Sequence, residues 1–312
     1  MGVLYVVSAE EAAGKTAICA GLAKYLLTEG KKVGYLKPSA AEKSGPDGDI
    51  AFMKQLLELS DAVNAPDLIK SRDVVLVEGM VGPDANDSMS QATYGAAREM
   101  KAKVLAVEDY SRQSSSYINS YKGFGENLLG VILNKVPESQ LKRVQDEASA
   151  KFGSAGISFL GAIPESRVLF AITIGELTES IQGKILNNAE KSAELVENYM
   201  LGAMVVDSGL DYFGRKSSKA AVVRQDRPDM QLAALETSTR CLVLSGSSES
   251  PFYNVMEKAE NRGIPIISTE SATDDIVASI EDALGKTRLN QEQKLTKITD
   301  IIKQNLDLKA IV

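Results

Sequence analysis

The triplet Gly14-Lys15-Thr16 near the start of the chain combines residue types that bind phosphate groups and magnesium ions. An apolar run over 3–7 predicts a buried strand before it, and a helix is predicted over Ala17–Thr28 after it. Backbone N–H groups in a loop that leads into a helix attract phosphate. The Lys15 ammonium would reach the β- and γ-phosphates of a nucleotide, and the Thr16 hydroxyl would bind Mg²⁺. The sequence therefore predicts a nucleotide-binding loop made of Glu10, Glu11, Ala12, Ala13, Gly14, Lys15, Thr16 and Ala17.

The loop departs from the usual phosphate-binding pattern. That pattern has a glycine five residues before Gly14, where this chain has Ala9. Ala12 and Ala13 carry a Cβ atom, which makes a left-handed backbone costly. The alternative is an ordinary strand, turn and helix with a chance Gly-Lys-Thr. The strand before the triplet and the helix after it favour the phosphate-binding loop.

Three polar side chains stand at the ends of later apolar runs, namely Lys37, Glu78 and Asn134. In a doubly wound sheet, ligands bind outside the carboxyl ends of the strands. Lys37 is accordingly a candidate catalytic residue together with Lys15, and Glu78 is a candidate Mg²⁺ ligand. Asn134 has the donors and the acceptor needed to pair with a nucleobase. The alternatives are a surface lysine, an acid at a turn and a turn-forming asparagine.

Strands and helices alternate along the first half of the chain. Strands are predicted at 3–7, 33–38, 73–79, 104–108 and 128–134, and helices near 88–100, 111–122 and 138–151. Continuous apolar runs are typical of strands that are buried on both faces of a parallel sheet. The sequence therefore predicts an α/β fold with a doubly wound parallel sheet.

Residues 1 to about 165 resemble the dethiobiotin synthetase branch of the phosphate-loop proteins. The motifs that carry the resemblance are Gly14-Lys15-Thr16, Lys37-Pro38, Asp47-Gly48-Asp49, Glu78-Gly79, Asn134 and Leu160-Gly161-Ala162-Ile163-Pro164. The resemblance implies that Lys15 and Lys37 contact the transferred phosphate. It also implies that Asp49 and Glu78 hold Mg²⁺ and that Asn134 reads adenine. Ser8-Ala9-Glu10-Glu11-Ala12 replaces the Gly-Thr-Asp-Thr-Gly pattern of that family, which argues against a biotin-type substrate.

The second half of the chain predicts a smaller α/β domain. Strand-forming runs at 202–206, 219–223, 241–244 and 264–267 alternate with helices near 229–236, 250–262 and 272–284, and 189–200 is rich in helix formers. Because the strands are short and the turns are rich in Gly and Ser, no large catalytic cleft is expected here.

Residues 172–285 resemble the domain named for a D-R-T-G-G motif. The resemblance rests on Gly202-Ala203-Met204, Gly209-Leu210-Asp211-Tyr212-Phe213, Asp226-Arg227-Pro228-Asp229, Leu242-Val243-Leu244-Ser245-Gly246 and Arg262-Gly263-Ile264-Pro265-Ile266-Ile267. Of the motif itself only Asp226-Arg227 remains. This pair is either part of a ligand site or an exposed pair at a turn.

The two domains in this order, 1–165 and 170–312, resemble the N-terminal portion of long phosphotransacetylases. No acetyl-transfer domain follows them in this sequence, so acetyl transfer is not expected. The resemblance implies a regulatory or sensing protein that binds Mg²⁺ with ATP, or with another nucleotide. The alternatives are an ATP-dependent ligase that phosphorylates a carboxylate or carbamate, and a protein that has lost nucleotide binding. Whether the nucleotide is hydrolysed stays open.

The composition excludes several classes of function. The 312 residues carry a net charge of −7, which argues against a nucleic-acid partner. Without histidine, neither His-based catalysis nor a His-rich metal site is available. No apolar run is long enough to span a membrane and no signal peptide is visible, so a cytoplasmic protein is expected. Cys19 and Cys241 lie in different domains, as expected for reduced thiols.

The tail over 290–312 predicts an amphipathic helix, since its apolar residues recur at helical spacing. Such a helix either packs on its own second domain or forms a contact between two copies in a homo-oligomer. A single apolar stripe is normal for a surface helix, so packing on the second domain is favoured.

Overall fold

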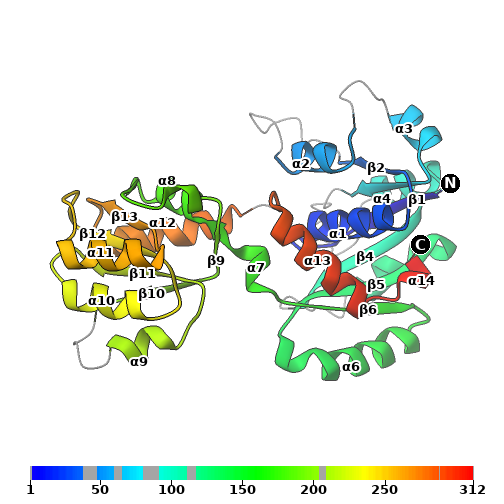
Figure 1. Cartoon of the computed structure of the whole chain (residues 1–312). Coiled ribbons are helices and arrows are strands. Elements are labelled where there is room, and N and C mark those ends of the chain that lie inside the picture. The colour runs from blue at the N-terminus through cyan, green and yellow to red at the C-terminus, as the bar shows by residue number, and fades with distance from the viewer. Residues whose placement is uncertain are drawn as a thin grey trace. The chain divides into compact units, whose positions relative to one another are not determined.

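The computed structural model describes residues 2–37, 48–59, 65–79, 91–110, 117–203, 209–287 and 289–311. They form two compact units (Figure 1). Unit 1 comprises Met1–Ser166 together with Leu289–Val312, and unit 2 comprises Arg167–Arg288. Unit 1 is therefore built from two separate stretches of the chain.

Unit 1 contains a six-stranded sheet in the order β2-β3-β1-β4-β5-β6, and all its neighbouring strands are parallel. The strands are β1 (Gly2–Val7), β2 (Val33–Leu36), β3 (Val74–Glu78), β4 (Lys103–Asp109), β5 (Leu128–Val136) and β6 (Phe159–Pro164). The register sets Val6 of β1 beside Glu78 of β3. Since β2 and β3 lie on one side of β1 and β4 to β6 on the other, the strand order reverses at β1. The predicted doubly wound parallel sheet is confirmed.

Helices cover both faces of this sheet. They are α1 (Lys15–Thr28), α2 (Gly48–Leu56), α3 (Ala65–Ser71), α4 (Gln91–Glu99), α5 (Tyr117–Lys122), α6 (Leu141–Ser154), α13 (Glu292–Asn305) and α14 (Leu308–Ile311), with 3-10 turns at Gly125–Asn127 and Glu138–Gln140. Tyr94 of α4, Tyr121 of α5 and Phe152 of α6 share one core with Val3, Tyr5 and Val7 of β1. Apolar residues on both faces of β1 are buried, which explains its unbroken hydrophobic run.

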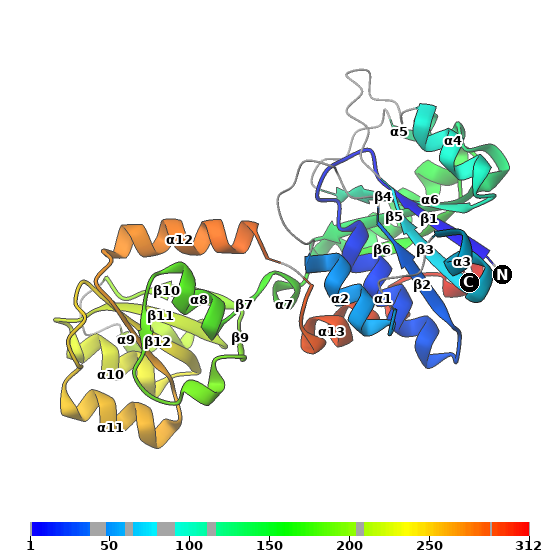
Figure 2. The same cartoon turned by 90° about the horizontal axis from the view of Figure 1, so that it is seen from above.

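The tail helix α13 packs along α1 in unit 1 (Figures 1 and 2). This differs from the expectation that the tail packs on the second domain. Gly21 supplies the reason, because its missing side chain leaves room on α1 for Ile298 and Ile302 of the tail. A Cβ atom on Gly21 would lie 2.5 Å from Ile302 Cδ1.

The end of α13 also joins the sheet. Gly161 of β6 forms a bridge with Leu306, and the Asp307 N–H donates to the Leu160 carbonyl at 2.9 Å. Gly161 has φ +133°, and a Cβ atom there would lie 2.1 Å from the Asn305 carbonyl oxygen. Glycine at this position therefore allows the tail to approach the strand.

Unit 2 contains a five-stranded sheet in the order β10-β11-β12-β13-β8, parallel except for β8 at the edge. The strands of the whole unit are β7 (Ile172–Thr173), β8 (Lys184–Ile185), β9 (Leu195–Val196), β10 (Asn198–Leu201), β11 (Lys219–Arg224), β12 (Thr239–Ser245) and β13 (Ile266–Thr269). Its helices are α7 (Arg167–Phe170), α8 (Ile174–Ser180), α9 (Gly209–Gly214), α10 (Pro228–Glu236), α11 (Tyr253–Arg262) and α12 (Thr273–Gly285), with a 3-10 turn at Ala189–Lys191. A two-stranded pair of β7 and β9 completes this second α/β unit.

Two expectations for unit 2 need correction. The helix-forming run at 189–200 contains β9 and most of β10 instead, because pairing with β7 and β11 outweighs local helix propensity. The strand expected at 202–206 lies earlier, as β10, and 204–206 is outside the described residues. A cavity of about 780 Å³ opens beside β11 and β12, and the expectation that this unit has no large catalytic cleft stays a prediction.

Other predicted features fall outside the described residues. These are Pro38, Asp47 and the helical stretches 88–90 and 111–116. Among the helices that are described, none combines the length and the apolar character needed to cross a membrane.

Candidate functional site

The predicted nucleotide-binding loop connects β1 to α1. Ser8 fixes its entry, because the Ser8 hydroxyl donates to the Glu10 carbonyl at 2.9 Å and accepts from the Glu10 N–H at 3.0 Å. Ala12 and Gly14 both have a positive φ, of 56° and 92°. The loop thus adopts left-handed backbone at an alanine as well as at a glycine, and the alanine stores strain.

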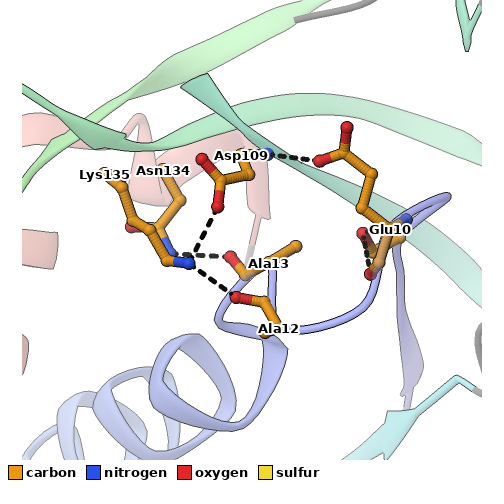
Figure 3. Close-up of polar contacts among 7 residues, drawn as sticks. Glu10, Ala12, Ala13, Asp109, Asn134 and Lys135 are labelled. Carbon is orange, nitrogen blue, oxygen red and sulfur yellow. Dashed lines mark hydrogen bonds and ion pairs between the residues drawn. The ribbon is translucent and has the colours of Figure 1, made fainter. Parts of the chain in front are cut away.

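Side chains from the ends of β4 and β5 bind the backbone of this loop (Figure 3). The Asn134 amide donates to the Ala13 carbonyl at 2.8 Å, and the Lys135 ammonium donates to the Ala12 carbonyl at 2.8 Å. The same ammonium forms an ion pair of 2.8 Å with Asp109. The Asp109 N–H in turn donates to the Glu10 carboxylate at 3.2 Å. Glu10 therefore turns its charge toward β4, where the carboxylate is buried.

Asn134 lies so close to the loop that only glycine fits at position 14. A Cβ atom on Gly14 would sit 2.2 Å from the Asn134 amide nitrogen. Asn134 was expected to read a nucleobase. Here its amide nitrogen binds the loop, and its oxygen accepts the Lys135 N–H at 2.9 Å. The contacts of Asn134 in this structure are those of a residue that positions the loop.

The first turn of α1 meets the ends of β2 and β3 on the other side of the loop. The Thr16 hydroxyl lies 3.0 and 2.9 Å from the two Glu78 oxygens, and the Tyr35 hydroxyl donates to Glu78 at 2.7 Å. Lys37 pairs with Asp49 at 2.9 Å and lies 3.9 Å from Glu78. The structure thus brings together Thr16, Lys37, Asp49 and Glu78, four of the residues selected from the sequence.

The remaining selected residues belong to the loop and to the first turn of α1. Lys15 is only 7% exposed, and burial lowers the pKa of its ammonium, with Glu78 opposing that shift. Burial also raises the pKa of the Tyr35 hydroxyl, which stays protonated as a donor to Glu78. Glu11 is exposed at the loop surface, and Ala17 lies in the first turn of α1.

The oxygen atoms around Glu78 fit a magnesium ion. A threonine hydroxyl beside a carboxylate, with a second carboxylate on Asp49 nearby, is a set of hard oxygen donors. Within the described ranges, no group of three or more His, Cys, Asp or Glu residues could hold a metal by itself. Mg²⁺ often relies on one or two carboxylates plus phosphate oxygens and water, so this donor set suits an ion carried in with a nucleotide.

Three residues of this site were missed in the sequence. Asp109 and Lys135 were missed because the predicted strands stop early, at 108 and 134, whereas β4 and β5 continue to Asp109 and Val136. The signal for Lys135 was its place directly after Asn134. Tyr35 was counted as an apolar strand residue, although its hydroxyl reaches Glu78.

Comparisons with known proteins agree with this organisation. Residues 3–70 match the AAA domain and residues 176–283 match the DRTGG domain. The predicted resemblance to the DRTGG domain is therefore confirmed, and for the first domain a phosphate-loop domain of the AAA class is confirmed. The chain is similar to phosphate acetyltransferases along most of its length.

The phosphate acetyltransferase of Salmonella typhimurium is 21% identical over 268 residues, which cover 75% of this chain and 37% of that protein. The phosphate acetyltransferase of Pseudomonas putida is 22% identical over 358 residues, which cover 98% of this chain and 51% of that protein. The chain thus spans about half the length, or less, of these phosphate acetyltransferases. A structure with the CBS and DRTGG domains of Clostridium perfringens pyrophosphatase, complexed with diadenosine tetraphosphate, is 18% identical. The matched region covers 41% of this chain and 54% of the pyrophosphatase chain, with a TM-score of 0.34.

Proposed function

We propose that this protein binds a nucleoside triphosphate, with ATP as the expected ligand, together with Mg²⁺ in the loop between β1 and α1. The role proposed for this site is regulatory, as in a nucleotide sensor. The observation that carries the proposal is the orientation of the loop peptides. Because the carbonyls of Ala12 and Ala13 are bound by Lys135 and Asn134, they point toward β5. In a planar trans peptide the N–H points opposite to the carbonyl, so the Ala13 and Gly14 N–H groups face away from β5.

This orientation suits an anion. Two N–H groups that face the same way beside the N-terminus of the 14-residue helix α1 form a site for phosphate oxygens. Lys15 adds a positive charge at the first position of that helix. Its burial strengthens the attraction to phosphate, because there is less water to screen the charge.

Calorimetry with Mg-ATP tests the proposal. Lys15→Ala should weaken binding by on the order of 30- to 150-fold. This factor corresponds to the loss of about 2–3 kcal/mol, which is typical of a charge-assisted hydrogen bond. Lys31→Ala removes an equal charge at an exposed position after α1 and should leave binding unchanged. Equal affinities for Mg-ATP in the Lys15 variant and the parent protein would refute the phosphate site.

The magnesium part of the proposal has its own test. Glu78→Gln and Asp49→Asn should weaken the binding of ATP in the presence of Mg²⁺ more than its binding in EDTA, since only the former uses the carboxylates. If either substitution weakened both kinds of binding equally, that residue would have no part in holding the ion.

A second candidate function is an ATP-dependent ligase that phosphorylates a carboxylate or carbamate. The position of Lys37 favours it, because the ammonium lies 3.9 Å from Glu78 and could contact a transferred phosphate. Phosphate release from ATP, measured across small carboxylates and diamines, separates the two functions. A sensor should show slow release that no substrate stimulates, whereas rapid stimulated release would establish the ligase.

A further inference from the structure

A cavity of about 780 Å³ lies within unit 2, at the carboxyl ends of β11 and β12. Its volume falls in the range of about 300–1,000 Å³ that is usual for small-molecule sites. The residues that matter for its chemistry are Arg224, Asp226, Ser245, Glu249, Phe252 and Asp274. None of them belongs to the nucleotide site of unit 1.

The topology of the sheet explains why a crevice opens here. The chain leaves β11 and β12 toward α10 and α11, whose apolar residues Met230 and Val255 share a core on one face. It leaves β13 toward α12, whose Ile276 packs in the core on the opposite face. Figure 2 shows α12 and α11 on opposite sides of the sheet. Connections that diverge at the carboxyl ends of parallel strands leave a crevice in which such folds bind ligands.

Hydrogen bonds between loops and strand ends fix the walls of this cavity. The Gln225 amide donates to the carbonyls of Glu249 and Ser250 at 3.3 and 3.2 Å and so joins two loops. Gln231 is fully buried, and its amide donates to the Arg224 carbonyl at 2.8 Å. The hydroxyls of Ser245 and Thr273 lie 3.1 Å apart, which ties the end of β12 to the start of α12. The cavity is therefore a preorganised part of the unit.

The lining combines one aromatic ring with a net negative charge. Phe252 stands at the rim with 59% of its surface exposed, so a flat ligand could stack on it. Arg224 is paired with Asp226 at 2.5 Å. In the described part of the chain, Glu249 and Asp274 have no such cationic partner. Carboxylates in excess repel phosphate groups and accept hydrogen bonds from hydroxyl and amino groups.

We propose that this cavity binds a nucleoside, that is, a planar nitrogen-containing ring joined to vicinal hydroxyl groups and free of phosphate. The ring stacks on Phe252, and the hydroxyl groups donate to the carboxylates of Glu249 and Asp274. The proposal goes beyond the nucleotide site of unit 1 and does not depend on it, because every group it uses lies in unit 2.

The absence of tryptophan from the chain allows a direct test. In full-length protein carrying Phe252→Trp, adenosine, guanosine, cytidine and uridine are titrated while the fluorescence of the single tryptophan is followed. At least one nucleoside should quench it to saturation, since a stacked base quenches an indole. Tyr253→Trp is the matched control, because Tyr253 is 80% exposed and lies outside the cavity lining, and it should not respond. Calorimetry should show that the unmodified protein binds the same nucleoside. The Phe252→Ala variant should show no such binding.

The charge of the lining gives a second readout. The 5′-monophosphate of the nucleoside that binds should bind more weakly by on the order of tenfold, because its charge faces the carboxylates. Asp226→Asn frees Arg224 and should reduce this difference. All titrations are repeated with Lys15→Ala, so that a failure of the nucleotide site in unit 1 does not affect the result. No saturable quenching by any nucleoside, equal quenching in both tryptophan variants, or tighter binding of the monophosphate would each overturn the proposal.

Discussion

At the scale of single residues, Lys135 binds the nucleotide-binding loop from the end of β5. It joins the Ala12 carbonyl to Asp109, which is 3% exposed. Removing the lysine from this partly buried pair leaves the buried Asp109 charge uncompensated. The orientation of the loop thus depends on a side chain that belongs to another strand.

Lys135→Met should therefore lower both nucleotide affinity and stability. We expect Mg-ATP to bind about tenfold more weakly and unfolding to require on the order of 3 kcal/mol less free energy. Lys142→Met, at an exposed position on α6, is the control and should change neither. Calorimetry and urea unfolding measure the two effects. Unchanged affinity in Lys135→Met would mean that the loop keeps its orientation by itself.

Glu108 makes stability depend on pH. It is 3% exposed on β4, and burial raises the pKa of its carboxyl from 4.5 to about 7. Tyr121 and Lys151 favour the ionised form, and Glu10 opposes it. Because the folded protein holds this proton more tightly than the unfolded chain, the contribution of Glu108 to stability falls as pH rises from 4.5 to about 7.

Glu108→Gln removes this dependence. Relative to the parent protein, the variant should gain on the order of 3 kcal/mol of unfolding free energy between pH 4.5 and 7.5, most of it below pH 7. Urea unfolding across this range measures the gain. Glu147→Gln, whose side chain is 63% exposed on α6, should run parallel to the parent protein. A parallel curve for Glu108→Gln as well would show that Glu108 titrates normally.

At the scale of elements, the contact between α1 and α13 links the two ends of unit 1. Besides the fit of Ile302 over Gly21, Lys303 lies 5.8 Å above the ring of Tyr25, and Lys24 lies 3.9 Å from Glu292. The latter pair is exposed and contributes little, so the apolar contact decides the stability of the tail.

A double-mutant cycle tests this contact. Ile302→Ala should cost about 2–5 kcal/mol, and Gly21→Ala about 1–3 kcal/mol through overpacking. The double variant should be more stable than the sum of the two losses predicts, since the new methyl group occupies space that the isoleucine vacates. Gly153→Ala, in α6 with open space around it, should instead be neutral or slightly stabilising. Strict additivity of the two losses would mean that the helices separate when either residue changes.

Elements were predictable where local pattern and tertiary environment agree. The strands of the first sheet are buried on both faces, so their apolar runs, such as Val74 to Val77, identified them from sequence alone. The run at 189–200 was not predictable, because its strands exist only through pairing with partners such as Ile172 and Lys219. The position of the tail was not predictable for a similar reason, since an apolar stripe predicts that a helix is packed but does not indicate on which surface.

Site residues followed the same division. Lys15 and Thr16 were selected from the sequence because a phosphate loop has a local pattern. Asp109 and Lys135 act through contacts with residues about one hundred positions away, such as Glu10 and Ala12, and no local pattern records them.

At the scale of the whole molecule, a sensor requires coupling between its two sites. If Mg-ATP binds unit 1 and a nucleoside binds unit 2, each should change the affinity of the other by the same factor, because coupling free energy is reciprocal. We expect a factor of about 5–150 in either direction. Calorimetry of each ligand with and without the other measures it. Affinities that do not respond would show two independent binding units and would leave the regulatory role unsupported.

The return of the tail to unit 1 has a consequence for synthesis on the ribosome. Residues 167–288 are made between the two stretches of unit 1, which takes on the order of 6–24 s at about 5–20 residues per second. During this delay the face of α1 around Gly21 has no cover, although the six strands are already complete. A nascent chain therefore exposes an apolar helix face that chaperones can bind until Ile298 and Ile302 emerge.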